Sequence, residues 1–211
     1  MKDIFFSTDW RASCASRQET LFSPVMAGLP VGSASALAIL PIHDANGQTL
    51  ESISDVRNGS GNPCVGILAI APLRGSTRIL HDLRERKVDR IFTWPSVAIF
   101  DEDMQEDLVP YGLTFEREVA FVQEAINQGF HTTATVFDSN QAARMVAAGA
   151  SRILLHPPLP NESERWLDRK MRDWIGAQIK LIGSMNVPIL VYVEGTAACA
   201  EFDCGIARYR S

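Results

Sequence analysis

RIFTWPSVAIFDEDMQEDLVPYG, the stretch from Arg90 to Gly112, decides how the rest of the chain is interpreted. Its apolar start, Ile91 to Trp94, meets Pro95, and proline lacks the N–H group that an interior strand donates, so a strand must end there. Polar residues follow at once, namely Ser96, Asp101, Glu102 and Asp103. In parallel α/β folds the loops at the carboxyl ends of the strands share one crevice, where ligands bind. The stretch therefore predicts a ligand site at that end of a parallel sheet.

The same order of apolar run, polar loop and amphipathic helix recurs along the chain. Further strands are predicted at Val65–Ala71, Thr132–Phe137, Arg152–His156 and Pro188–Val193. Their apolar residues are continuous rather than alternating, which indicates strands that are buried on both faces. The clearest helix has Phe115, Val119, Val122 and Ile126 on one face and ends near Gly129. Alternating strands and helices predict a parallel sheet that is covered by helices.

The spacing of the strands favours a TIM (β/α)8-type barrel. Strand starts lie about 31 residues apart, and such barrels usually need about 250 residues, with about 200 as the lower limit. A chain of 211 residues holds eight units only if its amino-terminal third is incomplete or compressed. Residues 1–23 show no sustained periodicity, so we expect an irregular segment there and a barrel domain over 24–211, with a first strand at Val25–Leu29.

Composition excludes several classes of protein. The hydrophobic content of 46% is enough for a sizeable core, and the net charge of −5 argues against a nucleic-acid partner. No apolar run approaches the ~18 residues of a membrane span, and the first ten residues lack the pattern of a signal peptide. Cys14, Cys64, Cys199 and Cys204 show no metal-binding spacing, which favours reduced thiols. We therefore expect a cytoplasmic protein without a nucleic-acid or membrane partner.

Six stretches carry a resemblance to a known family. They are LPIHDAN (40–46), APLR (71–74), WPSVAIFDED (94–103), GLTFEREV (112–119), TTATVFD (132–138) and MVAAGASRILLH (145–156). In this order they resemble the phosphoenolpyruvate hydrolase-like family, which is also described as TIM-barrel signal-transduction proteins. The resemblance implies a TIM barrel that acts on a small molecule.

The chain also departs from the family pattern. His43 replaces a glycine, Ala71 replaces an aspartate, and Glu194 with Gly195 and Thr196 replaces a His-Gly-Gly ending. The family's glycine-rich first strand is shortened or lost. The chain is therefore expected to be a diverged, shortened member.

Six residues at predicted strand ends are candidates for the site. Asp44 and Asn46 offer oxygen atoms, so Asp44 is a candidate catalytic residue and Mg²⁺ ligand, and Asn46 a substrate ligand; an Asx turn with a helix cap explains the pair equally well. His156 is a candidate proton-transfer group, with a structural histidine as the alternative. Glu194 is a candidate base or a helix cap. Arg74 and Ser96 are candidate substrate ligands, although a surface ion pair is the commoner role of an arginine.

Two functions remain open at this stage. One is an enzyme that cleaves a carbon–carbon or phosphoester bond in a keto acid or phosphorylated compound, with a divalent metal and with Asp44 and His156 acting together. The other is a catalytically degenerate barrel with a binding, regulatory or assembly role, favoured by the departures at Ala71 and Glu194. A shortened barrel would expose a sheet edge, so we also expect a homo-oligomer. Convergence of the candidate side chains would separate the two functions.

Overall fold

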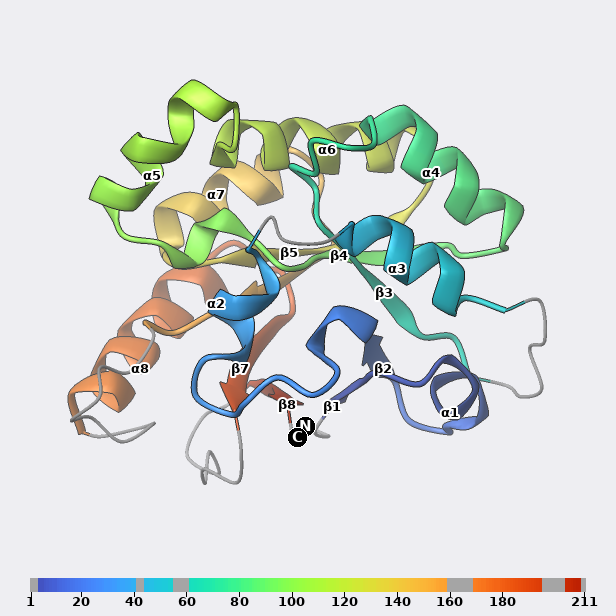
Figure 1. Ribbon diagram of the computed structural model, residues 1–211. Coiled ribbons are helices and arrows are strands. Elements are labelled where there is room, and N and C mark those ends of the chain that lie inside the picture. Colours follow the sequence, from blue (N-terminus) through green and yellow to red (C-terminus); the bar gives the residue numbers. More distant parts are fainter. Residues whose placement is uncertain (1–3, 41–43, 55–60, 159–168, 195–203, 210–211) are drawn as a thin grey trace.

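The computed structural model describes residues 4–40, 44–54, 61–158, 169–194 and 204–209 and contains a closed barrel of eight parallel strands (Figure 1). The strands pair in sequence order, and β8 pairs with β1 to close the barrel. Their bounds are β1 Ile4–Ser7, β2 Thr20–Phe22, β3 Cys64–Ile67, β4 Arg90–Thr93, β5 His131–Val136, β6 Arg152–Leu155, β7 Ile189–Glu194 and β8 Gly205–Tyr209. The predicted TIM (β/α)8-type barrel is confirmed.

Helices cover the outside of the barrel, and neighbouring ones pack against each other, as α4 does with α6 and α7 with α8 (Figure 1). The α-helices are α1 Trp10–Ala15, α2 Ala34–Ala38, α3 Ala45–Ser52, α4 Ser76–Glu85, α5 Glu102–Leu108, α6 Phe115–Asn127, α7 Ser139–Ala147 and α8 Arg169–Gly183. Within the described ranges the loops contain three short 3-10 helices, η1 Pro24–Met26, η2 Val97–Ile99 and η3 Val109–Tyr111. No helix within the described ranges is long and apolar enough to cross a membrane.

Local sequence signals explain the regular part of the barrel. Asp138 caps α7 by accepting from the Gln141 N–H at 2.8 Å, and the Gln141 side chain accepts in return from the Phe137 N–H. Gly129 and Gly149 follow α6 and α7 with φ of +82° and +100°, a left-handed conformation that glycine adopts without steric cost. These signals set where the two helices begin and end, and α6 carries the apolar face that the sequence predicted at Phe115, Val119, Val122 and Ile126.

The amino-terminal third differs from the sequence prediction. Residues 1–23, expected to be irregular and outside the barrel, contain β1, α1 and β2, and Val25–Leu29 begins with η1 instead of a strand. This part is compressed, as predicted, because α1 has six residues and α2 five, against thirteen in α6. It is not incomplete, because β1 pairs with both β2 and β8. The exposed edge that motivated the expectation of a homo-oligomer is therefore absent from the described barrel, and self-association stays a prediction.

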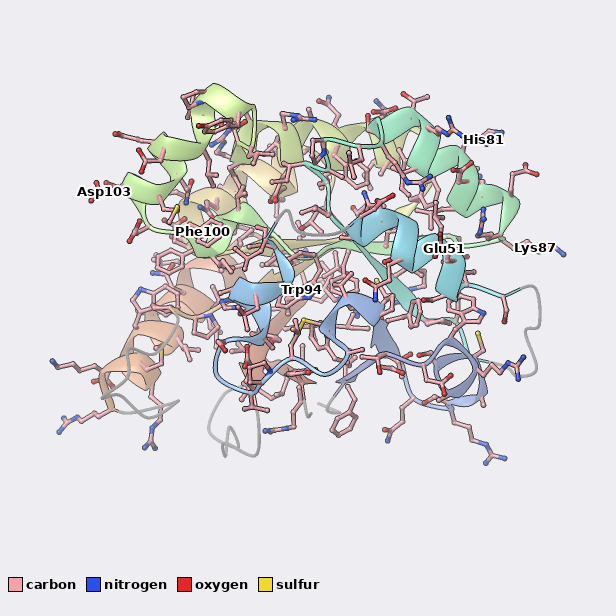
Figure 2. The ribbon with its side chains drawn as sticks, in the orientation of Figure 1. Glu51, His81, Lys87, Trp94, Phe100 and Asp103 are labelled. Atoms are coloured by element: carbon pink, nitrogen blue, oxygen red, sulfur yellow. The ribbon has the colours of Figure 1, made fainter. Side chains whose placement is uncertain are left out.

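Alternate residues of the strands fill the inside of the barrel. In β4 and the residue after it, Phe92 and Trp94 point into an inner aromatic cluster with Phe6 and Tyr192, whereas Ile91 packs outward under the helices. Gly66 leaves room for this packing, since a Cβ there would lie 3.0 Å from the Phe92 ring. Figure 2 shows Trp94 in the middle of the molecule, while His81 and Lys87 project outward. Cys14, Cys64 and Cys204 are buried and form no disulfide within the described chain.

Candidate functional site

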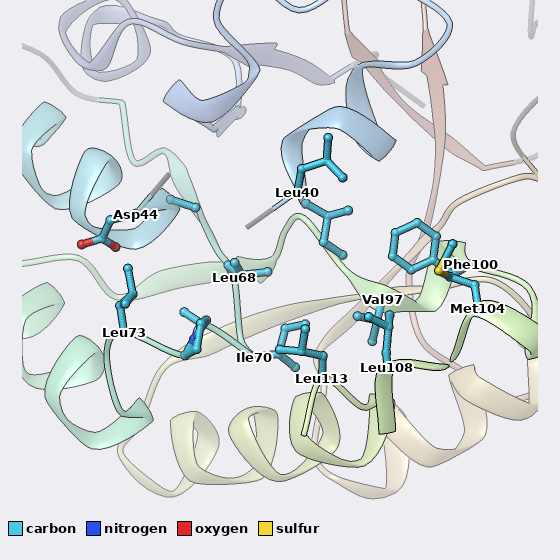
Figure 3. Close-up of a pocket in the computed structure, with 14 residues that line it drawn as sticks. Leu40, Asp44, Leu68, Ile70, Leu73, Val97, Phe100, Met104, Leu108 and Leu113 are labelled. Atoms are coloured by element: carbon cyan, nitrogen blue, oxygen red, sulfur yellow. The ribbon is translucent and has the colours of Figure 1, made fainter. Parts of the chain in front are cut away.

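A largely apolar pocket of about 280 Å³ opens at the carboxyl ends of β3 and β4 (Figure 3). Its walls come from the segments that follow these two strands, from the end of α2, the start of α3 and from α5. They are Ile39, Leu40, Asp44, Ala45, Leu68, Ile70, Ala71, Pro72, Leu73, Val97, Phe100, Met104, Leu108 and Leu113. We call this the mouth pocket. It occupies the end of the barrel at which TIM-barrel enzymes bind their ligands.

Asp44, which lines the mouth pocket, forms an ion pair with Arg74, which follows the lining residue Leu73 but is not itself one of the lining residues. The Arg74 Nε and Nη2 atoms each lie 3.1 Å from the Asp44 Oδ2 atom. The other carboxylate oxygen, Oδ1, accepts from the Gly47 N–H at 2.8 Å and so caps α3. A side chain at Gly47 would collide with this carboxylate, so the glycine permits the cap. About a third of each side chain is exposed, and this is the one candidate pair that the fold brings together at the pocket.

Asn46 holds one wall of the mouth pocket. Its buried amide donates to the Leu68 carbonyl at 3.0 Å and accepts from the Leu68 N–H at 2.9 Å. These two bonds tie α3 to the segment after β3, and Leu68 lines the pocket. The predicted substrate ligand is thus engaged with the backbone.

Ser96 binds Glu118, a residue that the sequence analysis did not select. The Ser96 hydroxyl donates to the Glu118 Oε2 atom at 2.6 Å, and the Val97 N–H donates to Oε1 at 3.0 Å. Both side chains are buried. Burial raises the pKa of Glu118 to about 7, although the two hydrogen bonds act in the opposite direction. A signal was present, because Glu118 lies three residues after Phe115 and four before Val122, on the apolar face of α6.

Glu194 fixes the start of α2. Its carboxylate, buried at the end of β7, accepts from the Gly32 N–H, from the Ser35 hydroxyl at 3.3 Å and from the Tyr192 hydroxyl at 2.9 Å. Burial, together with the charge of Glu194, raises the pKa of Tyr192 well above its ordinary value. Because α2 continues into Ile39 and Leu40 of the mouth pocket, Glu194 positions a wall rather than facing the cavity.

His156 lies in the inner aromatic cluster. Its ring centre is 4.7 Å from that of Tyr192 and 5.7 Å from that of Trp94, both in stacked orientation. Burial lowers the pKa of His156 to about 4, so the ring is neutral at pH 7. Among the described residues no hydrogen bond or ion pair joins His156 to Asp44, the residue with which it was expected to act.

The described residues do not fit the expected Mg²⁺. No group of three His, Cys, Asp or Glu side chains that could hold a metal occurs among them. Mg²⁺ requires an octahedron of oxygen atoms, and the Asp44 carboxylate is already shared between a guanidinium and a helix N–H. His43, noted as a departure from the family pattern, lies outside the described residues.

Comparison with known proteins shows the family. The sequence profile of the family described as phosphoenolpyruvate hydrolase-like matches residues 29–186, and the chain belongs to this family. The uncharacterized protein y4oT of Sinorhizobium fredii is 31% identical over 135 residues, which are 64% of this chain and 69% of that protein. The ToMV resistance protein Tm-1(GCR237) of Solanum lycopersicum is 29% identical over 127 residues, which cover 59% of this chain and 17% of that protein.

Solved structures share the fold at low sequence identity. A putative lyase/mutase from Burkholderia cenocepacia superposes with a TM-score of 0.59 at 13% identity, over 98% of this chain and 74% of that one. FabK from Thermotoga maritima gives a TM-score of 0.56 at 10% identity, over 99% of this chain and 57% of that one. At these identities the likeness concerns the barrel alone.

Proposed function

We propose that this member of the phosphoenolpyruvate hydrolase-like family binds a small organic acid with an apolar body in the mouth pocket, with Arg74 as the group that receives the acid. The observation that supports this most is the combination of an apolar cavity with one ion pair at its edge. Pockets for small molecules commonly combine apolar walls with a few placed polar groups that fix orientation. A hydrocarbon body would lie against Leu68, Ile70 and Val97.

Arg74 has hydrogen-bonding capacity left for such an acid. A guanidinium carries five N–H donors, and the described contacts of Arg74 use two of its nitrogen atoms, both toward the Asp44 Oδ2 atom. The planar fork suits a carboxylate, which accepts two parallel bonds. A compound that is polar throughout would leave the apolar walls without a matching surface, so an apolar acid is favoured over a phosphorylated one.

A second candidate is the bond-cleaving enzyme for a keto acid or phosphorylated substrate. The position of Asp44 and Arg74 at the carboxyl-terminal end of the barrel favours it, because TIM-barrel chemistry occurs there. Asn46, Ser96 and Glu194 are engaged with backbone or neighbouring side chains, so Asp44 is the candidate left to move a proton at the pocket.

Calorimetric titration with matched compounds tests the proposal. The probes are 4-methyl-2-oxopentanoate, phenylpyruvate, the amide of each acid, and phosphoenolpyruvate. We expect the two apolar acids to bind at least about tenfold more tightly than their amides, since an ionic hydrogen bond contributes about 1.5–3 kcal/mol. Release of phosphate or of a cleaved product in the same samples would favour the enzyme.

Two variants locate the site. Arg74→Gln should abolish the preference for acid over amide, whereas Arg78→Gln, on the exposed face of α4, should keep it. Ala71→Phe should fill the pocket and weaken acid and amide alike. Equal binding of acids and amides by the parent protein, or no binding of any probe, would contradict the proposal.

A further inference from the structure

Two polar atoms in the inner aromatic cluster have no hydrogen-bond partner among the described residues. The Trp94 Nε1 and His156 Nε2 atoms are buried and have no hydrogen-bond partner in the described part of the chain. The two side chains are 1% and 0% exposed, and their rings stack on each other. Buried polar side-chain atoms in folded proteins nearly always have a partner, so this pair needs an explanation.

The fold supplies such partners elsewhere. Trp10, which is also buried, donates from its Nε1 atom to the Ser54 carbonyl at 3.0 Å. The two indoles belong to the same chain and are similarly buried, yet only Trp10 has its donor satisfied by the protein. The missing partner of the Trp94 Nε1 atom is thus specific to the position of this residue after β4 and is not general to the buried indoles of this chain.

The two orphan atoms are chemically complementary. The His156 Nδ1 atom lies 2.6 Å from the Pro157 carbonyl, which can only accept, so Nδ1 carries the proton. The Nε2 atom of the neutral ring is therefore an acceptor, and burial keeps the ring neutral because it lowers its pKa to about 4. The indole N–H of Trp94 is a donor only. One donor and one acceptor thus occur in the same stack.

We propose that Trp94 and His156 form a binding site for one uncharged hydroxyl group, which accepts from the indole N–H and donates to the His156 Nε2 atom. The two rings stack with their centres 5.7 Å apart, so the indole N–H and the Nε2 atom belong to neighbouring side chains in direct contact. A carboxylate is excluded, because it has no hydrogen for Nε2. A water molecule and the hydroxyl of an alcohol or enol share the required chemistry.

The hydroxyl site is separate from the mouth pocket but adjacent to it. Leu68 packs both on the apolar cluster that contains Trp94 and on the one that contains Val97. The proposed hydroxyl site depends on the two buried nitrogen atoms and not on the proposed acid ligand. The result of the calorimetric titrations therefore neither supports nor contradicts it.

Proton NMR of the indole N–H groups tests the site. The parent protein should show a cross-peak between the Trp94 Nε1 proton and water, and Trp10 should show none, because a carbonyl holds its N–H. Trp94→Phe and Trp10→Phe assign the two signals. Tyr192→Phe should retain the water cross-peak, which separates direct contact from exchange through the nearby tyrosine hydroxyl.

Titration with methanol distinguishes the two sources of the hydroxyl. A cross-peak from the Trp94 Nε1 proton to the methanol methyl group would assign the site to ligand hydroxyls, and a water cross-peak that persists would assign it to water. In either case Trp94→Phe should shift the His156 Nε2 nitrogen signal, and Trp10→Phe should not. Absence of both cross-peaks at Trp94, or a proton on Nε2, would overturn the proposal.

Discussion

The two ends of the barrel use polar groups differently, with partly buried charges at one end and buried side chains at the other. At the amino-terminal end, Glu19 accepts from Arg90, at the start of β4, at 2.6 Å and from Arg152, at the start of β6, at 2.7 and 2.9 Å. Arg152 also donates to the Thr133 hydroxyl of β5 at 3.0 Å. Glu19 and the two arginines thus connect β4, β5 and β6 to the segment before β2. At the carboxyl-terminal mouth, by contrast, Asn46, Glu118 and Glu194 bind backbone groups of the segments that wall a pocket.

We infer from this difference that the polar groups at the amino-terminal end stabilise the barrel, whereas those at the mouth position the segments around the pocket. Burial alone would raise the pKa of Glu19, but the hydrogen bonds and charges of Arg152 and Arg90 lower it below its ordinary value. At the mouth, burial without a cationic partner raises the pKa of Glu118. TIM barrels in general keep function at the carboxyl-terminal face and stability at the opposite one. The following substitutions test this division.

Glu19→Gln should have the largest effect on stability. It leaves two guanidinium groups without a counter-charge, and the Arg152 side chain is only 14% exposed. Removing one partner of a fully buried ion pair costs about 3–5 kcal/mol. This cluster is partly buried, with 23% of the Glu19 and 30% of the Arg90 side chain exposed, so the lower end of that range applies. We expect a loss of about 3–4 kcal/mol in the free energy of unfolding, measured by urea denaturation, and unchanged ligand binding at the mouth. The exposed Glu85→Gln is the control, and an equally small effect of both would remove the distinction between the two ends.

Glu118→Gln should make the protein more stable above pH 7. The folded pKa of about 7 exceeds the ordinary glutamate value of 4.5, so the folded state binds the extra proton between these values and stability falls as pH rises from about 4.5 to about 7. The cost is complete above pH 7 and is about 3 kcal/mol, since each pKa unit corresponds to about 1.4 kcal/mol. Glutamine mimics the protonated form, so denaturation at pH 5 should show little difference from the parent and at pH 8 a gain of that size.

His156 should affect the pH dependence of stability in the opposite direction to Glu118. Its folded pKa of about 4 lies below the ordinary histidine value of 6.5, so the unfolded state binds the extra proton and stability falls as pH drops from about 6.5 to about 4. In the parent protein the effects of Glu118 and His156 on the free energy of unfolding should therefore partly cancel. His156→Phe should remove the loss of stability at acidic pH and keep the loss between pH 4.5 and 7 that Glu118 causes. Identical profiles for Glu118→Gln and the parent would contradict the role of Glu118.

The sequence predicted the fold best where apolar patterns and end signals agree. Helix α6 was predicted from its apolar face, Phe115 to Ile126, and from Gly129 at its end, and it spans Phe115–Asn127. The amino-terminal strands were missed because β2 has three residues and β1 four, too few to show a period. Strand β8 was missed for a similar reason. Gly205–Tyr209 has five residues and includes glycine, alanine and arginine, so its sequence shows no continuous apolar run, although all five residues are buried in the barrel.

The candidate site could be predicted in position but not in role. The sequence indicates that Ser96, His156 and Glu194 lie at strand ends, which share one side of a parallel barrel. Asp44 was also expected at a strand end, but it comes after α2 and caps α3. The sequence cannot indicate that Glu194 turns toward Gly32 or that Ser96 turns toward Glu118, because these contacts depend on loops that return from distant parts of the chain. The mouth pocket itself is formed by apolar residues, which carry no chemical signature in the sequence.

Asn46→Ala should have an intermediate effect on stability and should also weaken ligand binding. It removes two bonds and leaves the Leu68 N–H and carbonyl without the partners they have now. Loss of a partner for a buried group costs about 1–3 kcal/mol, so we expect about 2 kcal/mol in thermal or urea unfolding. Binding of an apolar acid should weaken as the Leu68 wall moves. The neighbouring solvent-facing Gln48→Ala is the control and should change neither quantity by much.

Arg74→Gln should have the smallest effect on stability and the most specific effect on binding. Its ion pair with Asp44 is about a third exposed, and such pairs contribute about 0–1 kcal/mol because water screens them. The Asp44 cap of α3 does not depend on the guanidinium, since it uses the other carboxylate oxygen. The preference for acid over amide should nevertheless disappear, whereas Glu19→Gln should leave that preference intact despite its much larger cost in stability. Loss of the preference in both variants, measured at a temperature where both are folded, would show that the two ends of the barrel are coupled and that the division between them does not hold.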